Sequence, residues 1–292
     1  TLFPYTTLFR SVIKSGNEIM TPGQKFPLRK ASWVKKMDFA SLMLALFFGT
    51  AALPHILIRY YTVRTPACAR KSTIVAIAAI GFFYILTMYM GLGAMVNRVV
   101  NPASNNMSAP LLAKSFNSVL FAIISAIAFA TVLGTVSGLI VAASGAVAHD
   151  IMDRFGSLKM TEKQKVTAGK LAAFTVGLVA IILGIVFQGM NVSYLVGWAF
   201  AVADSANLPA ILMLLFWKRT TAKGIVASII VGIIVAVGWI LLSPDMYVRY
   251  GYLRDDSFLP FSNPGIVAIP ASFLTLVLVS LLTQKKAQAV QA

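Results

Sequence analysis

The chain is poor in charged residues and especially in acids. Only 12% of its 292 residues are charged, with 9 Asp+Glu against 25 Lys+Arg, while 58% are hydrophobic. A soluble domain of this composition would lack the polar side chains that cover a water-facing surface, so we expect an integral membrane protein. The basic residues are scattered over short loops rather than gathered on one face, which excludes a typical nucleic-acid-binding protein.

Cysteine and histidine are also nearly absent. The single cysteine, Cys68, excludes a disulfide framework and a cysteine metal cluster. The two histidines, His55 and His149, are too far apart in sequence to form a recognisable ligand pair. The sequence contains no GxSxG, HExxH or glycine-rich phosphate loop and no paired carboxylates at a useful spacing. We therefore expect neither an enzyme nor a resident cofactor or metal.

What the chain does have is a series of long apolar runs. Seven stretches are long and uncharged enough to cross a bilayer, namely 39–58, 72–96, 115–149, 169–187, 192–217, 223–242 and 263–283. Most loop lysines and arginines follow the first, third, fifth and last of them, which predicts a cytoplasmic C-terminus. The basic segment 1–38 disagrees with this orientation. Together with the odd number of helices and the missing initiator Met, it suggests the back half of a larger protein.

The third stretch carries a polar stripe on one helix face. Steps of three or four residues separate Thr131, Thr135, Gly138, Ala142 and Gly145. The oxygens of Thr131, Gly134 and Thr135 could form half of a cation site near the middle of the membrane. Alternatively, the small residues permit close helix packing and the hydroxyls bond back to the preceding turn. The spacing alone favours packing.

The first stretch contains a proline within its apolar run. Pro54 cannot donate to the helix ladder, so we expect a break near Gly49–Thr50 that leaves carbonyl groups unpaired inside the membrane. Broken helices build binding sites in secondary transporters, although an ordinary proline kink has the same sequence signal. His55 is either a proton relay or a buried neutral histidine.

The fifth stretch contains Asp204, the only carboxylate inside any predicted span. A charged group in the bilayer interior is costly, so this residue needs a partner, a water-filled cavity or a proton. Asn207 and Pro209 follow within about one turn and add an amide and a second break. Asp204 is therefore a candidate functional residue, and the alternative is a simple anchor for a helix contact.

Three classes of membrane protein fit these features, and transport fits best. A channel should show polar stripes on several helices, whereas only the third stretch has a clear one. A sensor or assembly subunit would need a soluble output domain, and the loop 150–170 is too short to form one.

Several motifs resemble a known family, the sodium:solute symporters. The run RTTAKGIVASIIVGIIV resembles the second signature of that family, with Arg219, Gly224, Ser228 and Gly232 at the expected positions. It departs from the signature at Leu214 and Ile225. The runs LPHILIRYYTV, ARKS, GFFYILT and ASGAVAHDI resemble the acetate, or monocarboxylate, branch. The similarity extends over roughly residues 38–283, while residues 1–11 resemble no part of the family and could be non-native.

The resemblance implies an all-α membrane protein with the LeuT-like inverted-repeat fold. Residues 39–217 would form the five-helix second repeat, residues 218–292 two C-terminal transmembrane helices with a cytoplasmic tail, and residues 1–38 a periplasmic segment. The implied function is cation-coupled uptake of acetate or a related monocarboxylate at the bacterial inner membrane. Another solute of the same family is the alternative.

The resemblance also implies a set of site residues. The sodium site of the family falls on Thr131, Gly134 and Thr135, where Gly134 departs from the pattern because it has no side-chain oxygen. That departure leaves open whether sodium or a proton is the coupling ion. No cofactor beyond the transported cation is implied, and the oligomeric state stays undefined. Apart from the resemblance, the positions of Thr50, His55, Asp204 and Asn207 make them candidates to line the substrate pathway.

Overall fold

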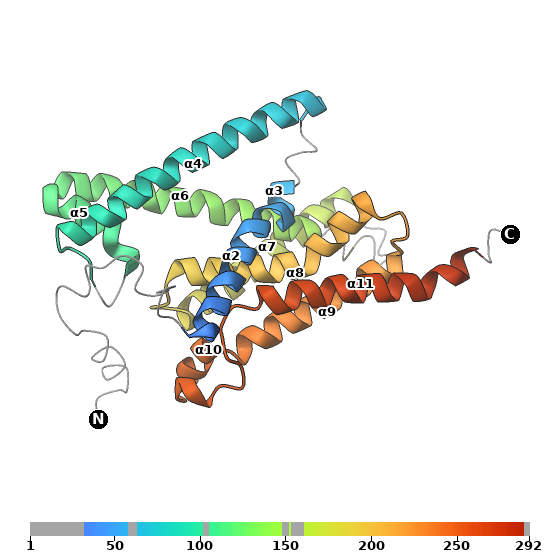
Figure 1. The fold of residues 1–292 in the computed structure, drawn as a ribbon. Helices are drawn as coiled ribbons and strands as arrows, with labels where there is room; N and C mark the ends of the chain where they lie inside the picture. The colour runs from blue at the N-terminus through green and yellow to red at the C-terminus, as the bar shows by residue number, and fades with distance from the viewer. Residues whose placement is uncertain (1–31, 58–62, 102–104, 148–151, 153–160, 289–292) are drawn as a thin grey trace. The chain divides into compact units, whose positions relative to one another are not determined.

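The computed structural model describes residues 32–57, 63–101, 105–147, 152 and 161–288 of the chain (Figure 1). Every regular element within these ranges is a helix, as the sequence predicts. The described helices divide into two compact units. Unit 1 contains residues 63–191, and unit 2 contains residues 32–57 together with 192–288.

Six helices in the described ranges are long and apolar enough to cross a membrane, one fewer than the seven predicted. The exception is the first helix, α2, at Trp33–Ala52. It begins earlier than predicted and so includes Lys35, Lys36 and Asp38, and it ends at Ala52 rather than at residue 58 because Pro54 follows. The six spans are Pro66–Val96, Ser118–Gly145, Glu162–Val186, Val192–Phe216, Ala222–Leu241 and Gly265–Gln284.

Unit 1 is built from helices with well-defined starts. Its elements are α4 (Pro66–Val96), η2 (Asn105–Met107), α5 (Ser108–Phe116), α6 (Ser118–Gly145) and α7 (Glu162–Val186). The Thr65 side chain accepts a hydrogen bond from the Cys68 amide at the start of α4. Asn117 is extended and accepts from the Val119 amide, so it separates α5 from α6 and divides the predicted stretch 115–149.

Unit 2 packs four long helices around small residues. Its elements are α2, α3 (Pro54–Leu57), α8 (Val192–Phe216), α9 (Ala222–Leu241), α10 (Pro244–Arg249), η4 (Arg254–Asp256) and α11 (Gly265–Gln288). Helices α9 and α11 run side by side (Figure 1). Ala52, Leu208 and Ile269 form a buried cluster from α2, α8 and α11, so the core of the unit lies where these three helices meet.

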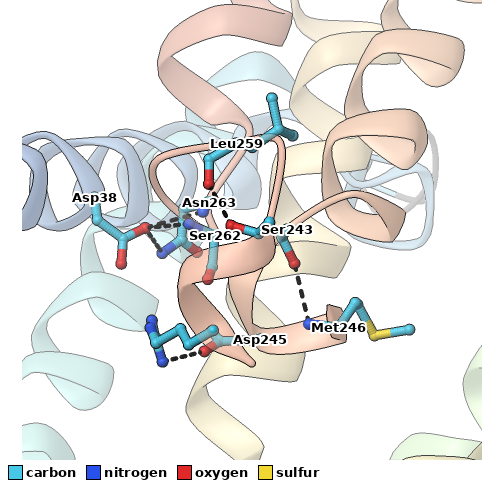
Figure 2. A network of polar contacts seen from close by, with 9 residues as sticks. Asp38, Ser243, Asp245, Met246, Leu259, Ser262 and Asn263 are labelled. Carbon is cyan, nitrogen blue, oxygen red and sulfur yellow. Dashed lines mark hydrogen bonds and ion pairs between the residues drawn. The ribbon is translucent and has the colours of Figure 1, made fainter. Parts of the chain in front are cut away.

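A network of hydrogen bonds joins the start of α2 to the residues just before α11 (Figure 2). One carboxylate oxygen of Asp38 accepts hydrogen bonds from the amides of Ser262 (3.1 Å) and Asn263 (2.9 Å) and from the Asn263 side-chain amide (2.7 Å). The Ser41 hydroxyl donates to the Asn263 carbonyl at 2.6 Å and accepts from the Ile266 amide at 3.0 Å. These contacts satisfy otherwise unpaired donors at the N-terminus of α11.

Candidate functional site

The predicted cation ligands lie on α6 in unit 1, where the helix is continuous. Thr131, Gly134 and Thr135 are within one turn of each other and all are exposed. The Thr131 hydroxyl donates to the Ile127 carbonyl at 2.8 Å, and the Thr135 hydroxyl donates to the Thr131 carbonyl at 3.0 Å. Both hydroxyls therefore bond back to the preceding turn, and they place the Thr135 oxygen beside the Thr131 carbonyl.

The small residues of this stripe have no packing partner among the described residues. A Cβ added at Gly134, Gly138 or Gly145 would meet no heavy atom within 4 Å. Elsewhere in unit 1, a Cβ at Gly177 of α7 would touch Ile140 of α6 at 3.9 Å. The close packing that the stripe also suggested is thus not made at these glycines within unit 1, where Thr131, Thr135 and Gly138 are exposed and Ala142 and Gly145 are partly buried.

The first predicted break lies at Leu53 in unit 2, later than the sequence suggested. Gly49 and Thr50 remain helical, α2 ends at Ala52, and Leu53 is extended with φ −80° and ψ 117°. Pro54 lacks an amide hydrogen, so the Thr50 carbonyl loses its helical donor although Thr50 keeps its helical conformation. The side chain of Thr50 is exposed, and the side chain of His55 in α3 lies outside the described residues.

Asn207 contacts the break directly. Its side-chain amide donates to the Ala52 carbonyl at 3.0 Å. In an unbroken helix that carbonyl would accept from the Ile56 amide, which instead donates to Leu53 at 3.0 Å. An amide from α8 therefore replaces the backbone donor that the break removes. The structure brings together two predicted site elements, the broken helix and Asn207.

Asp204 lies one turn before Asn207 in α8 and is fully buried. Neither of its carboxylate oxygens has a hydrogen-bond partner among the described residues. The sequence raised two alternatives for Asp204, a functional residue and a simple anchor for a helix contact, and both stay open. A buried carboxyl group without donors is costly as a carboxylate, so it calls for a proton, a water molecule or a cation.

Comparison of the sequence with known proteins identifies a family. Residues 8–232 match the model of the sodium:solute symporter family. The chain belongs to the sodium:solute symporter family. The match ends at the last glycine of the predicted signature, and it begins inside residues 1–11, which we had set apart. No solved structure matches the chain.

Two curated relatives of this symporter chain agree with that assignment. It is 40% identical over 296 residues to a protein of Bacillus subtilis named uncharacterized symporter YwcA, covering 97% of the chain and 56% of that protein. It is 43% identical over 267 residues to the monocarboxylic acid transporter of Corynebacterium glutamicum, covering 88% of the chain and 48% of that protein. The chain thus spans about half the length of the curated relatives it matches.

The symporter signature on α9 has a structural use in this chain. Its small residues Gly224, Ser228 and Gly232 recur every four positions and are all buried. The Ser228 hydroxyl lies 2.8 Å from that of Ser272 on α11. A Cβ at Gly232 would collide with the Ser205 carbonyl of α8, so only glycine permits this approach. That carbonyl is the one that Pro209 deprives of its helical donor.

The Asp38 network was not predicted from the sequence. Asp38 is the last residue of the segment 1–38 that we assigned outside the membrane, and in the structure it belongs to α2. The only local signal is the run Ser262, Asn263, Pro264 and Gly265, which is typical of a turn before a helix. Nothing in that run indicates which distant carboxylate will accept its amides.

Proposed function

We propose that the protein containing this chain takes up a small monocarboxylate, such as acetate, driven by a cation gradient across the bacterial inner membrane. The observation that carries the proposal is the 43% identity to a protein named monocarboxylic acid transporter, within a family of symporters. The multiple apolar helices provide the membrane part. Alternating access around a site near the midplane is the mechanism that this class of transporter uses.

The proposed cation ligands are Thr131, Gly134 and Thr135 on α6. The local geometry supports the two threonines, because the Thr135 hydroxyl oxygen and the Thr131 carbonyl oxygen are already 3.0 Å apart. Rotating the Thr135 hydroxyl hydrogen away would release both oxygens for one ion. Gly134 can offer only its carbonyl, which accepts from the Ser137 hydroxyl at 3.0 Å. Sodium is the proposed coupling ion, and a proton is the alternative.

The proposed substrate pathway runs past the broken helix of unit 2. Its residues are Thr50, His55, Asp204 and Asn207. The support is the helix end at Ala52, which exposes backbone acceptors, and the Asn207 amide that reaches it. We further propose that the C-terminus is cytoplasmic, on the distribution of loop lysines and arginines.

The test is sodium-dependent uptake of labelled acetate by the full-length protein in proteoliposomes. Thr135→Ala should raise the sodium concentration for half-maximal uptake by about tenfold, because one ligand oxygen is lost. The matched control is Thr175→Ala on α7, whose exposed hydroxyl also bonds back one turn, to Leu171 at 3.0 Å. An unchanged sodium dependence in Thr135→Ala would refute the α6 site, and an absence of acetate uptake by the wild type would refute the substrate class.

A further inference from the structure

The contacts between α2 and α8 fix what lies opposite Asp204. A Cβ at Gly197 would meet Leu42, a Cβ at Gly49 would meet the Phe200 ring, and Asn207 bonds to Ala52. Residue numbers rise together along the two helices, so α2 and α8 run parallel. Asp204 lies between the second and third of these contacts. The last turn of α2, from Gly49 to Ala52, is therefore level with Asp204.

The helical period also directs Asp204 toward that turn. Phe200 and Asn207, four residues before it and three after, both contact α2. Leu208, four residues after it, packs with Ala52 of α2 and Ile269 of α11. Residues at these spacings share a helix face, so the Asp204 side chain faces the seam between α2 and α11. The adjacent residue, Ser205, belongs to the face that meets α9 at Gly232.

The Asp204 carboxylate and the end of α2, which lie level with each other, both present hydrogen-bond acceptors. The C-terminal end of a helix carries unpaired carbonyls and a partial negative charge. Here Pro54 has no amide hydrogen to donate to the Thr50 carbonyl. The Asn207 side-chain amide donates to the Ala52 carbonyl. The carboxylate of Asp204, fully buried, adds a further pair of unpartnered oxygens.

The described residues provide no ion-pair partner for Asp204. The hydrophobic side chains packed around Ala52 and Leu208 are Leu44, Phe48, Leu212, Ile269 and Phe273. Carboxylate and carbonyl oxygens brought close together repel each other unless a cation or a proton lies between them.

We propose that Asp204 and the Thr50 carbonyl at the end of α2 bind a sodium ion in unit 2, distinct from the ion proposed at α6. Carboxylate and carbonyl oxygens suit a hard cation, and the carbonyl ends of broken helices are used for sodium in membrane transporters. The site depends on the proposed function only for the identity of the ion. Its ligands belong to one compact unit, so binding can be measured without any solute transport.

The test is equilibrium binding of radioactive sodium to the purified 292-residue chain in detergent micelles, with choline chloride holding the ionic strength constant. Asp204→Asn should abolish sodium binding at the proposed site in unit 2. Pro54→Ala, which restores a donor to the Thr50 carbonyl and keeps the carboxylate, should weaken sodium affinity about tenfold. The matched control is Pro66→Ala, because Pro66 occupies the first turn of α4, where no helical donor is lost.

The second control separates this site from the one proposed at α6. Thr135→Ala should leave sodium binding at Asp204 intact. The binding assay does not depend on acetate uptake, so a failure of uptake in the full-length protein would not affect its result. The inference is overturned if Asp204→Asn binds sodium as the wild type does or if Pro54→Ala has unchanged affinity. It is also overturned if the wild type binds no sodium and its thermal stability responds only to pH, since a proton would then occupy the carboxyl.

Discussion

The two units contain equally apolar helices that are used in different ways. In unit 1, between 0 and 6% of the residues in the 18-residue apolar segments of α4, α6 and α7 are buried. In unit 2, the corresponding share for α8, α9 and α11 is 22 to 39%. Hydrophobicity therefore does not decide which helices pack on one another, because lipid and protein are similar environments for an apolar side chain.

The difference follows from the small residues and what each one meets. On α9, the buried glycines and serine touch α8 and α11, and a Cβ at Gly224 would collide with Ser280. On α6, Gly134 and Gly138 have the same kind of spacing and meet nothing within unit 1. Spacing of small residues thus indicates an available face, and only the structure shows which of those faces is filled.

Among the substitutions that test this difference between the units, we expect the largest loss of stability at Gly232. Gly232→Ala places a Cβ against the Ser205 backbone carbonyl, which cannot rotate away, so α8 and α9 must separate. We expect a loss of about 1–3 kcal/mol of unfolding free energy, typical of overpacking. The measurement is the thermal unfolding midpoint of the purified chain in detergent.

The matched control for that substitution lies on the same helix. Gly238→Ala adds a Cβ that meets no heavy atom within 4 Å, and alanine favours the helix over glycine by about 0.5–1 kcal/mol. Equal midpoints for the two variants would show that α9 and α8 do not meet at Gly232.

A smaller loss is expected at Asp38, where unit 2 joins helices far apart in the sequence. Asp38→Ala removes the acceptor for three donors on Ser262 and Asn263. Water can replace part of this bonding because the contact is only half-buried, so we expect the free energy of unfolding to fall by about 1–2 kcal/mol. The exposed Asp255 provides the control, since Asp255→Ala should change the unfolding midpoint little. A midpoint equal to that of the control would contradict the network.

How far the sequence leads is clear from these same helices. Length and lack of charge predicted α8 as 192–217 and α9 as 223–242, within one residue of Val192–Phe216 and Ala222–Leu241. The break in α2 was predicted from Pro54 but placed too early, because losing a hydrogen bond does not oblige Thr50 to leave the helical conformation. The Asp38 network could not be predicted, since it joins residues more than two hundred positions apart.

Prediction of the candidate site was similarly uneven. Asp204 and Asn207 were found because a polar group in an apolar run is a strong signal. Their different situations, one bonded to Ala52 and the other without a partner, depend on the register between α2 and α8, which no local pattern specifies. Thr131 and Thr135 were candidates from the polar stripe, which by itself favoured packing, and the family resemblance shifted the prediction to a cation site.

The smallest expected effect is on the stripe of unit 1, and it tests the contrast most directly. Gly138→Ala adds a Cβ that meets no heavy atom within 4 Å. We therefore expect the free energy of unfolding to stay unchanged or to rise by at most about 1 kcal/mol. The measurement is again thermal unfolding in detergent, beside Gly232→Ala. A destabilisation as large as that of Gly232→Ala would mean that the stripe of α6 packs closely against another part of the protein. In that case the small residues of both units would serve the same purpose, and the accessible face that the α6 cation site requires would not exist.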